Sequence, residues 1–389
     1  MYEPFFCFIL FMIVTRLKLN HYRNHTATNI TCGAGINLIT GPNGAGKTNL
    51  IDAIHYVCMS RSFVSSSDMY VVKQGESAFS IETEVEGQIR SHFSLSCKYS
   101  RGDGKIFFVN DSPLERLADL IGIVPVVVLS PDDRKITSEG PAERRTFLDA
   151  MISQSSKSYL TDLIEYRKIV RQRNKLLSGY FPDTSVLKAI LEPWDYQLIH
   201  TGSRIIAKRT AVLHQFSKYL EAGYEKISDI KLRPWFEYKT ICEPSVDEET
   251  IRNTYSELLR EAQIKEIDRQ MTLIGPHRDD LTFFLDDMEL RKFGSQGQHR
   301  LFALSLKMAE LHFFSETLDD LPVFLLDDVF GDLDPSKIKV LTEMLAEHPG
   351  QSFVTAANEA PFKGLISFSD EKNKRFQVEP GAVIQSTSE

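Results

Sequence analysis

One stretch of eight residues constrains the fold of this chain more than any other feature: Gly41-Pro42-Asn43-Gly44-Ala45-Gly46-Lys47-Thr48. It fits the pattern G-x-x-x-x-G-K-[ST] at every fixed position. Residues 36–40 before it read as a short buried strand, and apolar residues recur after it at helical spacing. A strand, a glycine-rich loop and a helix are the setting of a phosphate-binding loop (P-loop), so the sequence predicts an α/β nucleotide-binding fold.

The chemistry of this loop explains its residue types. Glycines let the backbone wrap closely, so that its N–H groups point at phosphates, and the following helix N-terminus adds positive potential. We expect Lys47 to reach the β- and γ-phosphates of ATP and Thr48 to hold Mg²⁺. The alternative is a chance glycine turn before a helix, which leaves the coincidence of pattern and context unexplained.

Composition limits the other functions open to the 389 residues. The net charge is −8, so any DNA-binding surface must be a local basic patch. Five scattered cysteines without a C-x-x-C pair favour a reducing, cytoplasmic compartment over disulfides or a zinc site. The apolar run Phe5 to Val14 is too short to span a bilayer, and we expect no membrane role.

The chain divides into four predicted parts that differ in residue composition and in hydrophobic pattern. Residues 1–11 should be an extension outside the fold. Residues 12–140 read as the first part of an ATPase head, with an antiparallel β meander beside the P-loop unit. Residues 141–270 read as a helical arm broken by prolines, including Pro193. Residues 271–389 return to α/β and complete the head.

A second motif lies near the end of the chain. The apolar strand Val323 to Leu326 runs into Asp327-Asp328, a Walker B pattern. Because α/β sheets place ligands at the carboxyl ends of strands, Asp327 can bind the Mg²⁺ that Thr48 also contacts. Asp328 is placed to orient or deprotonate the attacking water, which makes it the candidate catalytic residue. A solvated strand end is the structural alternative.

A third motif precedes Walker B: Ser295-Gln296-Gly297-Gln298. Ser295 is a natural N-cap for the long helix predicted after it, and this cap alone could account for the residue. The order and spacing, however, resemble the signature motif of ABC-type ATPases. That resemblance implies that the tetrad contacts the ATP of a second subunit in an ATP-dependent, head-to-tail homodimer.

Several segments narrow the resemblance to the RecF family of bacterial recombination mediators. The matching segments are Arg16–His25, Pro141–Asp149, Gln172–Leu177, Gly275–Asp280 and Leu325–Asp334. The resemblance implies a P-loop ATPase head with an inserted helical arm, and it adds Arg23 and Asn24 to the nucleotide-binding residues. Ser130–Asp133 stands where related ATPases carry a coupling Gln, and Thr355 stands where transporters carry a switch His, so turnover should be slow.

The same resemblance implies the function. It points to an ATPase that binds duplex DNA near single-strand gaps, works with RecR and RecO and helps to load RecA. The local support is a basic run that includes Arg171, Arg173 and Lys175, although charge runs are commonly just solvated faces. A membrane-transporter ATPase would need its P-loop nearer the signature, whereas Thr48 and Ser295 lie 247 positions apart. An architectural chromosome protein would need long heptads, which are absent. The roles of His277 and Arg278 stay open.

Overall fold

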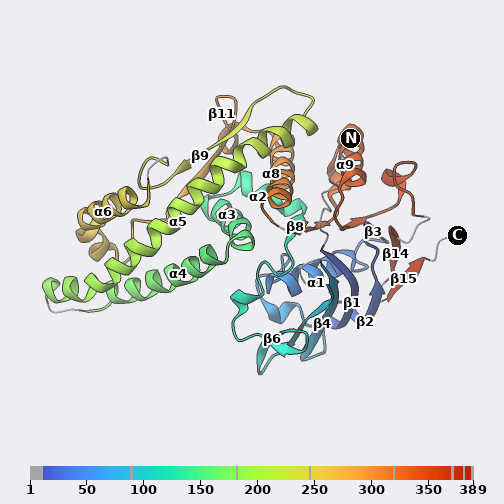
Figure 1. Ribbon diagram of the computed structural model, residues 1–389, viewed down its shortest axis with the longest axis horizontal. Helices are drawn as coiled ribbons and strands as arrows, with labels where there is room; N and C mark the ends of the chain where they lie inside the picture. The colour runs from blue at the N-terminus through green and yellow to red at the C-terminus, as the bar shows by residue number, and fades with distance from the viewer. Residues whose placement is uncertain are drawn as a thin grey trace, which may run out of the picture. The chain divides into compact units, whose positions relative to one another are not determined.

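A computed structural model describes residues 12–87, 91–180, 183–244, 247–318, 320–368, 372–379 and 382–386 (Figure 1). The predicted extension, residues 1–11, lies outside the described residues. The chain forms two compact units. The first contains the residues up to Asp133 and from Lys307 onwards, and the second is Arg134–Leu306. Residues 271–306, which the sequence analysis placed in the head, therefore belong to the second unit.

The first unit contains two six-stranded sheets. One has the order β2-β1-β4-β5-β6-β7, with every neighbouring pair antiparallel. In β4, Phe79, Ile81, Thr83 and Val85 are buried while their neighbours are half-buried or exposed, as expected of a strand with one face on the core. The strands are β1 (Ile13–Tyr22), β2 (His25–Thr31), β4 (Ala78–Glu86), β5 (Phe93–Ser100), β6 (Gly104–Val109) and β7 (Ser112–Pro113).

The other sheet has the order β15-β14-β3-β13-β12-β8. All of its neighbouring pairs are parallel except β14 with β15. The central strands are buried along their length, which parallel strands covered on both faces require. The strands are β3 (Ile36–Thr40), β8 (Val126–Leu129), β12 (Val323–Leu326), β13 (Ser352–Ala356), β14 (Lys374–Glu379) and β15 (Ala382–Ser386).

Helix α1 (Lys47–Met59) contacts strands of both sheets and is buried along nearly its whole length. One apolar cluster therefore joins side chains from both sheets and this helix. The unit also contains α9 (Pro335–Glu347) and the 3₁₀ turns η1 (Asp68–Tyr70), η2 (Leu117–Asp119), η3 (Pro131–Asp133), η4 (Val329–Asp332) and η5 (Ala360–Phe362). The predicted α/β head with its antiparallel meander is confirmed.

The second unit is built on the long helices α4 (Lys157–Leu177) and α5 (Thr184–Ile227), which pack against each other. Helix α6 packs on α5, and a three-stranded antiparallel sheet has the order β11-β10-β9. The remaining bounds are α2 (Arg134–Ser138), α3 (Pro141–Ser155), β9 (Pro234–Lys239), α6 (Glu248–Arg269), β10 (Asp280–Leu285), β11 (Met288–Glu289) and α7 (Leu290–Phe293). Helix α8 (Gln296–Thr317) begins in this unit and ends in the first.

Two features of the second unit differ from the prediction. Pro193 was expected to interrupt the helices, yet it lies inside the single 44-residue helix α5. A proline removes the hydrogen bond to the carbonyl four residues earlier, here Ala189. Because Ala189 is exposed, water can reach that carbonyl and the helix continues. The predicted helical arm also contains β9, which pairs with β10. None of the helices formed by the described residues combines the length and the hydrophobicity that crossing a membrane requires.

Candidate nucleotide site

Parallel pairing brings three distant segments to one edge of the mixed sheet. Strand β3 pairs with β13, and β13 pairs with β12, all in the same direction. Their carboxyl ends therefore meet, although the P-loop and Walker B are far apart in sequence. At this edge, Thr48 lies at the start of the helix after β3, Asp327 directly follows β12, and Thr355 is the last residue but one of β13.

Asp327 accepts hydrogen bonds from two hydroxyl groups at this edge. Thr48 Oγ1 donates to its Oδ1 over 2.8 Å, and Thr355 Oγ1 donates to the same oxygen over 2.9 Å. The carboxyl is buried, and burial raises its pKa, while the two hydroxyl bonds lower it. The P-loop threonine and the Walker B aspartate are thus in direct contact, and their predicted sharing of a Mg²⁺ ion stays a prediction.

Thr355 is a site residue that the sequence analysis missed. It was noted only as a departure from a histidine, yet its buried hydroxyl links both Walker B acids. Besides donating to Asp327, Thr355 Oγ1 accepts the backbone N–H of Asp328 over 2.8 Å. Asp328 itself is exposed, in the left-handed backbone region at φ 48°. Thr355 therefore fixes the backbone from which the candidate catalytic carboxylate projects.

The P-loop is held in a conformation that only glycine allows at its last turn. Gly46 has φ 113°, and a Cβ there would lie 2.4 Å from the side-chain amide of Asn24. At Gly44, φ is +80° and an added Cβ would meet no atom within 4 Å, so this side of the loop is open. Lys47 Nζ donates to the carbonyls of Gly41 at 2.8 Å and Pro42 at 3.2 Å. The ammonium group of Lys47 is thus held against the first two residues of the loop.

Asn24 lies behind the loop. Its Nδ2 donates to the carbonyl of Ala45 over 2.6 Å, and its Oδ1 accepts from Asn49 Nδ2 over 2.7 Å. The buried ring of His25 is 3.2 Å from the carbonyl of Gly46. These bonds attach the P-loop to the turn between β1 and β2, so Asn24 positions the loop. Its assignment as a direct nucleotide contact stays a prediction.

Arg23 is fixed by a buried acid. Asp52 Oδ2 accepts from Arg23 Nε over 3.0 Å and from the hydroxyl of Tyr22 over 2.8 Å, and Asp52 has no exposed surface. Ser62 Oγ bonds both Asp52 and Arg23, each at 2.9 Å. Burial and the charge of Asp52 raise the pKa of Tyr22, which stays a hydrogen-bond donor. Arg23 is therefore held rigidly, and its contact with nucleotide stays a prediction.

In the second unit, the signature tetrad forms a capping box at the start of α8. Ser295 Oγ accepts the backbone N–H of Gln298 over 3.2 Å, and Gln298 Oε1 accepts the backbone N–H of Ser295 over 2.8 Å. The predicted N-cap is confirmed. Ser295, Gln296 and Gly297 are exposed, so the helix N-terminus can be reached by another molecule.

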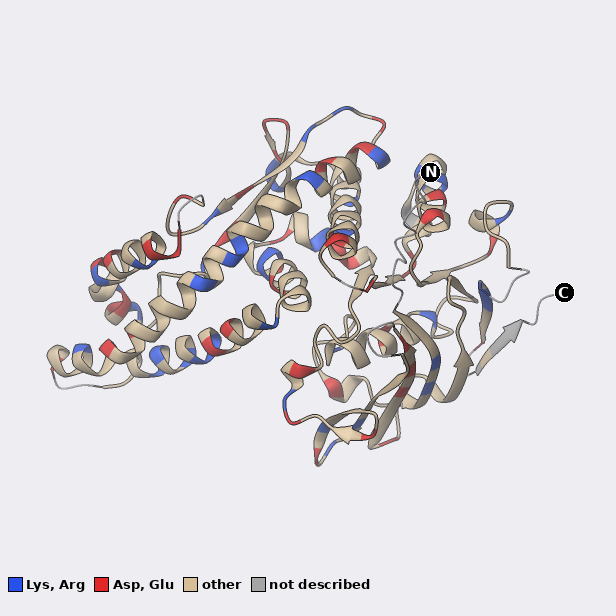
Figure 2. Ribbon diagram, in the orientation of Figure 1, with Lys and Arg blue, Asp and Glu red and all other residues tan. Residues whose placement is uncertain are grey.

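The predicted DNA patch on α4 needs one correction. Arg171 and Lys175 are exposed, but Arg173 has no exposed surface. Its guanidinium pairs with Glu266 Oε2 at 2.6 Å and with Asp195 Oδ1 at 2.7 Å. The prediction that Arg173 contacts DNA is therefore wrong, because its side chain points into the core of the unit. Figure 2 shows the basic residues of α4 among acidic ones.

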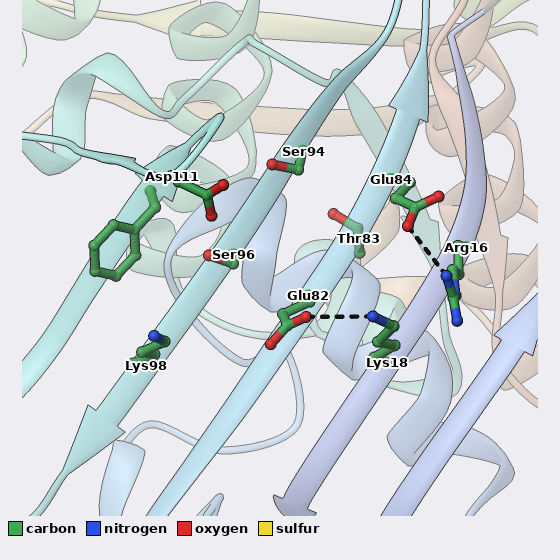
Figure 3. Close-up of a pocket in the computed structure, with 10 residues that line it drawn as sticks. Arg16, Lys18, Glu82, Thr83, Glu84, Ser94, Ser96, Lys98 and Asp111 are labelled. Atoms are coloured by element: carbon green, nitrogen blue, oxygen red, sulfur yellow. Dashed lines mark hydrogen bonds and ion pairs between the residues drawn. The ribbon is translucent and has the colours of Figure 1, made fainter.

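A separate hollow of about 380 Å³ lies on the antiparallel sheet of the first unit (Figure 3). No sequence motif pointed to it. Its charges are largely compensated: Arg16 lies 3.4 Å from Glu84 and Lys18 lies 3.7 Å from Glu82. Lys98 lies over the ring of a neighbouring phenylalanine. A surface with paired charges of both signs does not select an anionic ligand.

Comparisons with known proteins agree with this geometry. The family model described as RecF/RecN/SMC N terminal domain matches residues 13–377. The DNA replication and repair protein RecF of Salinibacter ruber is 40% identical, covering 95% of this chain and 91% of its own length. The protein of the same name from Chloroherpeton thalassium is 38% identical, covering 90% of this chain and 96% of its own length.

Solved structures extend the likeness to three dimensions. The recombination mediator protein RecF-ATP in the RecFOR pathway has a TM-score of 0.88 at 30% identity, covering 97% of this chain and all of its own. The Smc head domain of Pyrococcus furiosus, at 14% identity and a TM-score of 0.58, covers 97% of this chain and 96% of its own, and it shares the fold. The Walker motifs in contact, the inserted helical unit and these relatives agree: the chain belongs to the RecF family.

Proposed function

We propose that this chain is a cytoplasmic, ATP-dependent DNA-binding recombination mediator of DNA replication and repair. The observation that carries the proposal is the contact of Thr48 with Asp327 beside an open glycine loop. A hydroxyl and a carboxylate at this place are the groups that Mg²⁺–ATP sites use. A relative at 30% identity is described as RecF-ATP, which supports ATP as the ligand.

The site's own groups suit a magnesium ion shared with phosphates. Mg²⁺ is bound by one or two protein oxygens together with phosphate oxygens and water, rather than by a cage of acids. Thr48 and Asp327 supply such a pair, and the described residues contain no cluster of three or more metal-ligating side chains. Thr48 and Asp327 would hold the ion, which neutralises phosphate charge when bound.

Each remaining group at the loop has a separate role. Lys47 exchanges the loop carbonyls for β- and γ-phosphate oxygens when ATP enters. Asp328 orients the attacking water, and Thr355 fixes the backbone that carries it. Asp has a shorter side chain than Glu, which supports slow turnover. The activity is therefore a weak, DNA-stimulated ATPase whose main effect is to release the protein from DNA.

ATP also joins two copies of the chain head to tail in this proposal. The exposed Ser295, Gln296 and Gly297 of one copy, together with its half-buried Gln298, contact the γ-phosphate held by the other. The start of α8 is suited to this, because its N–H groups and positive end attract anions. The dimer then encloses duplex DNA next to single-strand gaps, where RecR and RecO act with it and RecA is loaded downstream.

The test measures ATP binding, oligomer size by light scattering, and binding to gapped duplex DNA in parallel. The parental protein should dimerise and bind DNA only with ATP, and Lys47→Ala should lose both. Ser295→Arg should still bind ATP as a monomer but fail to dimerise, because its side chain fills the phosphate position. Ser295→Ala is the matched control, since it loses the same helix cap without adding bulk.

Two outcomes would contradict the proposal. If Ser295→Arg no longer binds ATP as a monomer while Ser295→Ala does, the tetrad acts within its own subunit. If the parental protein binds gapped DNA equally with and without ATP, the nucleotide does not control DNA binding.

A further inference from the structure

The second unit contains a pocket of about 260 Å³ that the nucleotide site does not use. Helices α3, α4 and α5 and the turn after Gly275 supply its walls. Three arginines and one aspartate line it, namely Arg145, Arg167, Arg209 and Asp149. With three cations and one anion, the pocket has an excess of positive charge unless neighbouring carboxylates compensate it.

Arg209, which has almost no exposed surface, is fully compensated. Its guanidinium donates to Asp149 Oδ1 at 2.8 Å and to Asp279 Oδ2 at 2.9 Å. It also donates to the hydroxyl of Tyr159 at 3.0 Å and to the carbonyl of Pro276 at 2.8 Å. Two carboxylates therefore face this one buried cation, and four of the five N–H donors of Arg209 are already used within the protein.

Arg145 is different, because its hydrogen bond goes to a neutral group. Its Nη1 donates to the backbone carbonyl of Asp279 over 2.7 Å. Among the described residues no carboxylate forms an ion pair with it, whereas the adjacent Arg144 is bidentate to Asp280 at 2.7 and 3.0 Å. Burial, followed by the charge of Arg209, lowers the pKa of Arg145. An anion in the pocket would relieve this repulsion.

Arg167 stands at the opening of the same pocket. One of its nitrogens, Nη2, lies 3.0 Å from Asp149 Oδ2, and its side chain is 60% exposed. Among the described residues, its remaining guanidinium N–H groups form no hydrogen bond. His277 contributes no positive charge at neutral pH, since burial lowers its pKa to about 4. Its Nε2 bonds the carbonyl of Thr272, and its Nδ1 accepts from the hydroxyl of Tyr166.

The exposed face of α4 continues the positive charge from Arg167. At about 100° per residue, Arg167, Lys168, Arg171 and Lys175 fall within roughly 100° of one another around the helix. All of them are exposed, and so is Lys157 on the same face. Of the acidic residues of α4, Asp162 is paired with Arg204 at 2.5 Å, and Glu165 borders the basic face, about 60° beyond Lys168 around the helix.

We propose that Arg145 and Arg167 together hold one phosphate group of a DNA strand, and that this strand runs on along the basic face of α4. Guanidinium groups form paired, charge-assisted hydrogen bonds with phosphate oxygens, and two can share one phosphate. The basic face is defined as Lys157, Arg167, Lys168, Arg171 and Lys175. This inference rests on the proposed DNA-binding function and assigns its phosphate site, replacing the buried Arg173.

The experiment measures the affinity of the ATP-bound full-length protein for gapped duplex DNA over a range of salt concentrations. Arg167→Ala and Arg145→Met should each weaken binding at least about tenfold at low salt. Each should also reduce the slope of log K against log salt by about 0.9. The double variant should lose no further slope, because both arginines hold the same phosphate. Lys265→Ala, an exposed cation on α6, is the matched control and should behave like the parent.

Tryptophan fluorescence shows that each variant is folded, since Trp194 and Trp235 both lie in this unit. The phosphate site is overturned if folded Arg167→Ala keeps the parental salt slope. It is also overturned if the double variant loses twice as much slope as each single variant, since the two arginines would then hold different phosphates. Inorganic phosphate is titrated at constant ionic strength as a second probe. If it binds the pocket while the DNA slope stays parental in the variants, the pocket takes a small anion instead. If the parental protein binds no DNA with ATP, the proposed function has failed, which is a separate result.

Discussion

The buried ion pair of Arg173 yields a prediction that separates stability from DNA binding. Its Nη2 lies 2.6 Å from Glu266, its Nε 2.7 Å from Asp195, and its Nη1 donates to Thr272 at 3.0 Å. Glu266 has no exposed surface, and within the described part of the chain its other oxygen accepts a hydrogen bond only from the N–H of Leu273, at 2.7 Å. Arg173→Met would therefore leave a buried carboxylate with a single hydrogen bond.

Removing one partner of such a pair costs about 3–5 kcal/mol, because the remaining charge is not solvated. For a unit of this size, each kcal/mol lowers the melting temperature by about 2–4 °C. We therefore expect a decrease of roughly 6–20 °C. Asp195 is partly exposed and can be hydrated, so the expected loss comes mainly from Glu266.

Tryptophan fluorescence is a suitable assay, because Trp194 precedes Asp195 directly and Trp235 lies in the same unit. Arg171→Met, an exposed change on the same helix, should melt like the parent. Combining Arg173→Met with Glu266→Leu should restore part of the loss, since both charges are then removed. The reasoning is refuted if Arg173→Met melts at the parental temperature, or if the double variant is less stable than the single one. Below its melting temperature, Arg173→Met should keep the parental salt dependence of DNA binding.

Three further predictions concern the nucleotide site. Thr355→Val should destabilise the first unit more at pH 7 than at pH 4 in melts followed by circular dichroism, whereas Thr355→Ser should not. Losing the hydroxyl bond raises the pKa of buried Asp327 further above its value in the unfolded chain. The folded state then binds this proton more tightly than the unfolded state, so the free energy of unfolding decreases as the pH rises from the unfolded pKa to the folded pKa. Gly46→Ala should abolish ATP binding in equilibrium dialysis, because its Cβ would clash with Asn24; retained affinity would show that the loop can move. Asp328→Asn, which tolerates the left-handed backbone, should bind ATP but hydrolyse it about 10²–10⁴-fold more slowly in single turnover, and a parental rate would exclude it as the base.

Local patterns predicted the elements that carry the site. Strands β3 and β12 have the predicted bounds, since short apolar runs bordered by loop motifs leave little freedom. The helix N-cap formed by Ser295 could likewise be predicted from the neighbouring residues alone. Thr355 could not be recognised, because a threonine in a buried strand looks like any β-branched residue until its neighbour across the sheet is known. The contact of Asn24 with the P-loop depends on long-range packing in the same way.

The error at Arg173 had a signal in the sequence. The buried stripe of α4 runs through Tyr166, Ile169 and Leu177, and Arg173 lies on that stripe at i, i+4 spacing. The charge of Arg173 favours a DNA contact, whereas its position on the helix indicates burial. Its partner Glu266 lies on another helix, which no local pattern indicates. Pro193 shows that a general rule can also be applied too strictly. A proline breaks a helix where it leaves a buried carbonyl without its backbone hydrogen bond, but the effect is weaker where water can replace that hydrogen bond.

The order of strands around the P-loop also bears on how the chain is made. Strand β3 ends at Thr40, but its two neighbours in the sheet are β13 (Ser352–Ala356) and β14 (Lys374–Glu379). At about 5–20 residues per second, a ribosome needs roughly 15–60 s to reach β13 after β3. During that time the strand that carries the nucleotide loop has neither of its sheet partners. The nascent chain cannot form its candidate nucleotide site, and a transcript truncated before β13 yields a product with an unpaired apolar strand, which is a substrate for chaperones and proteases.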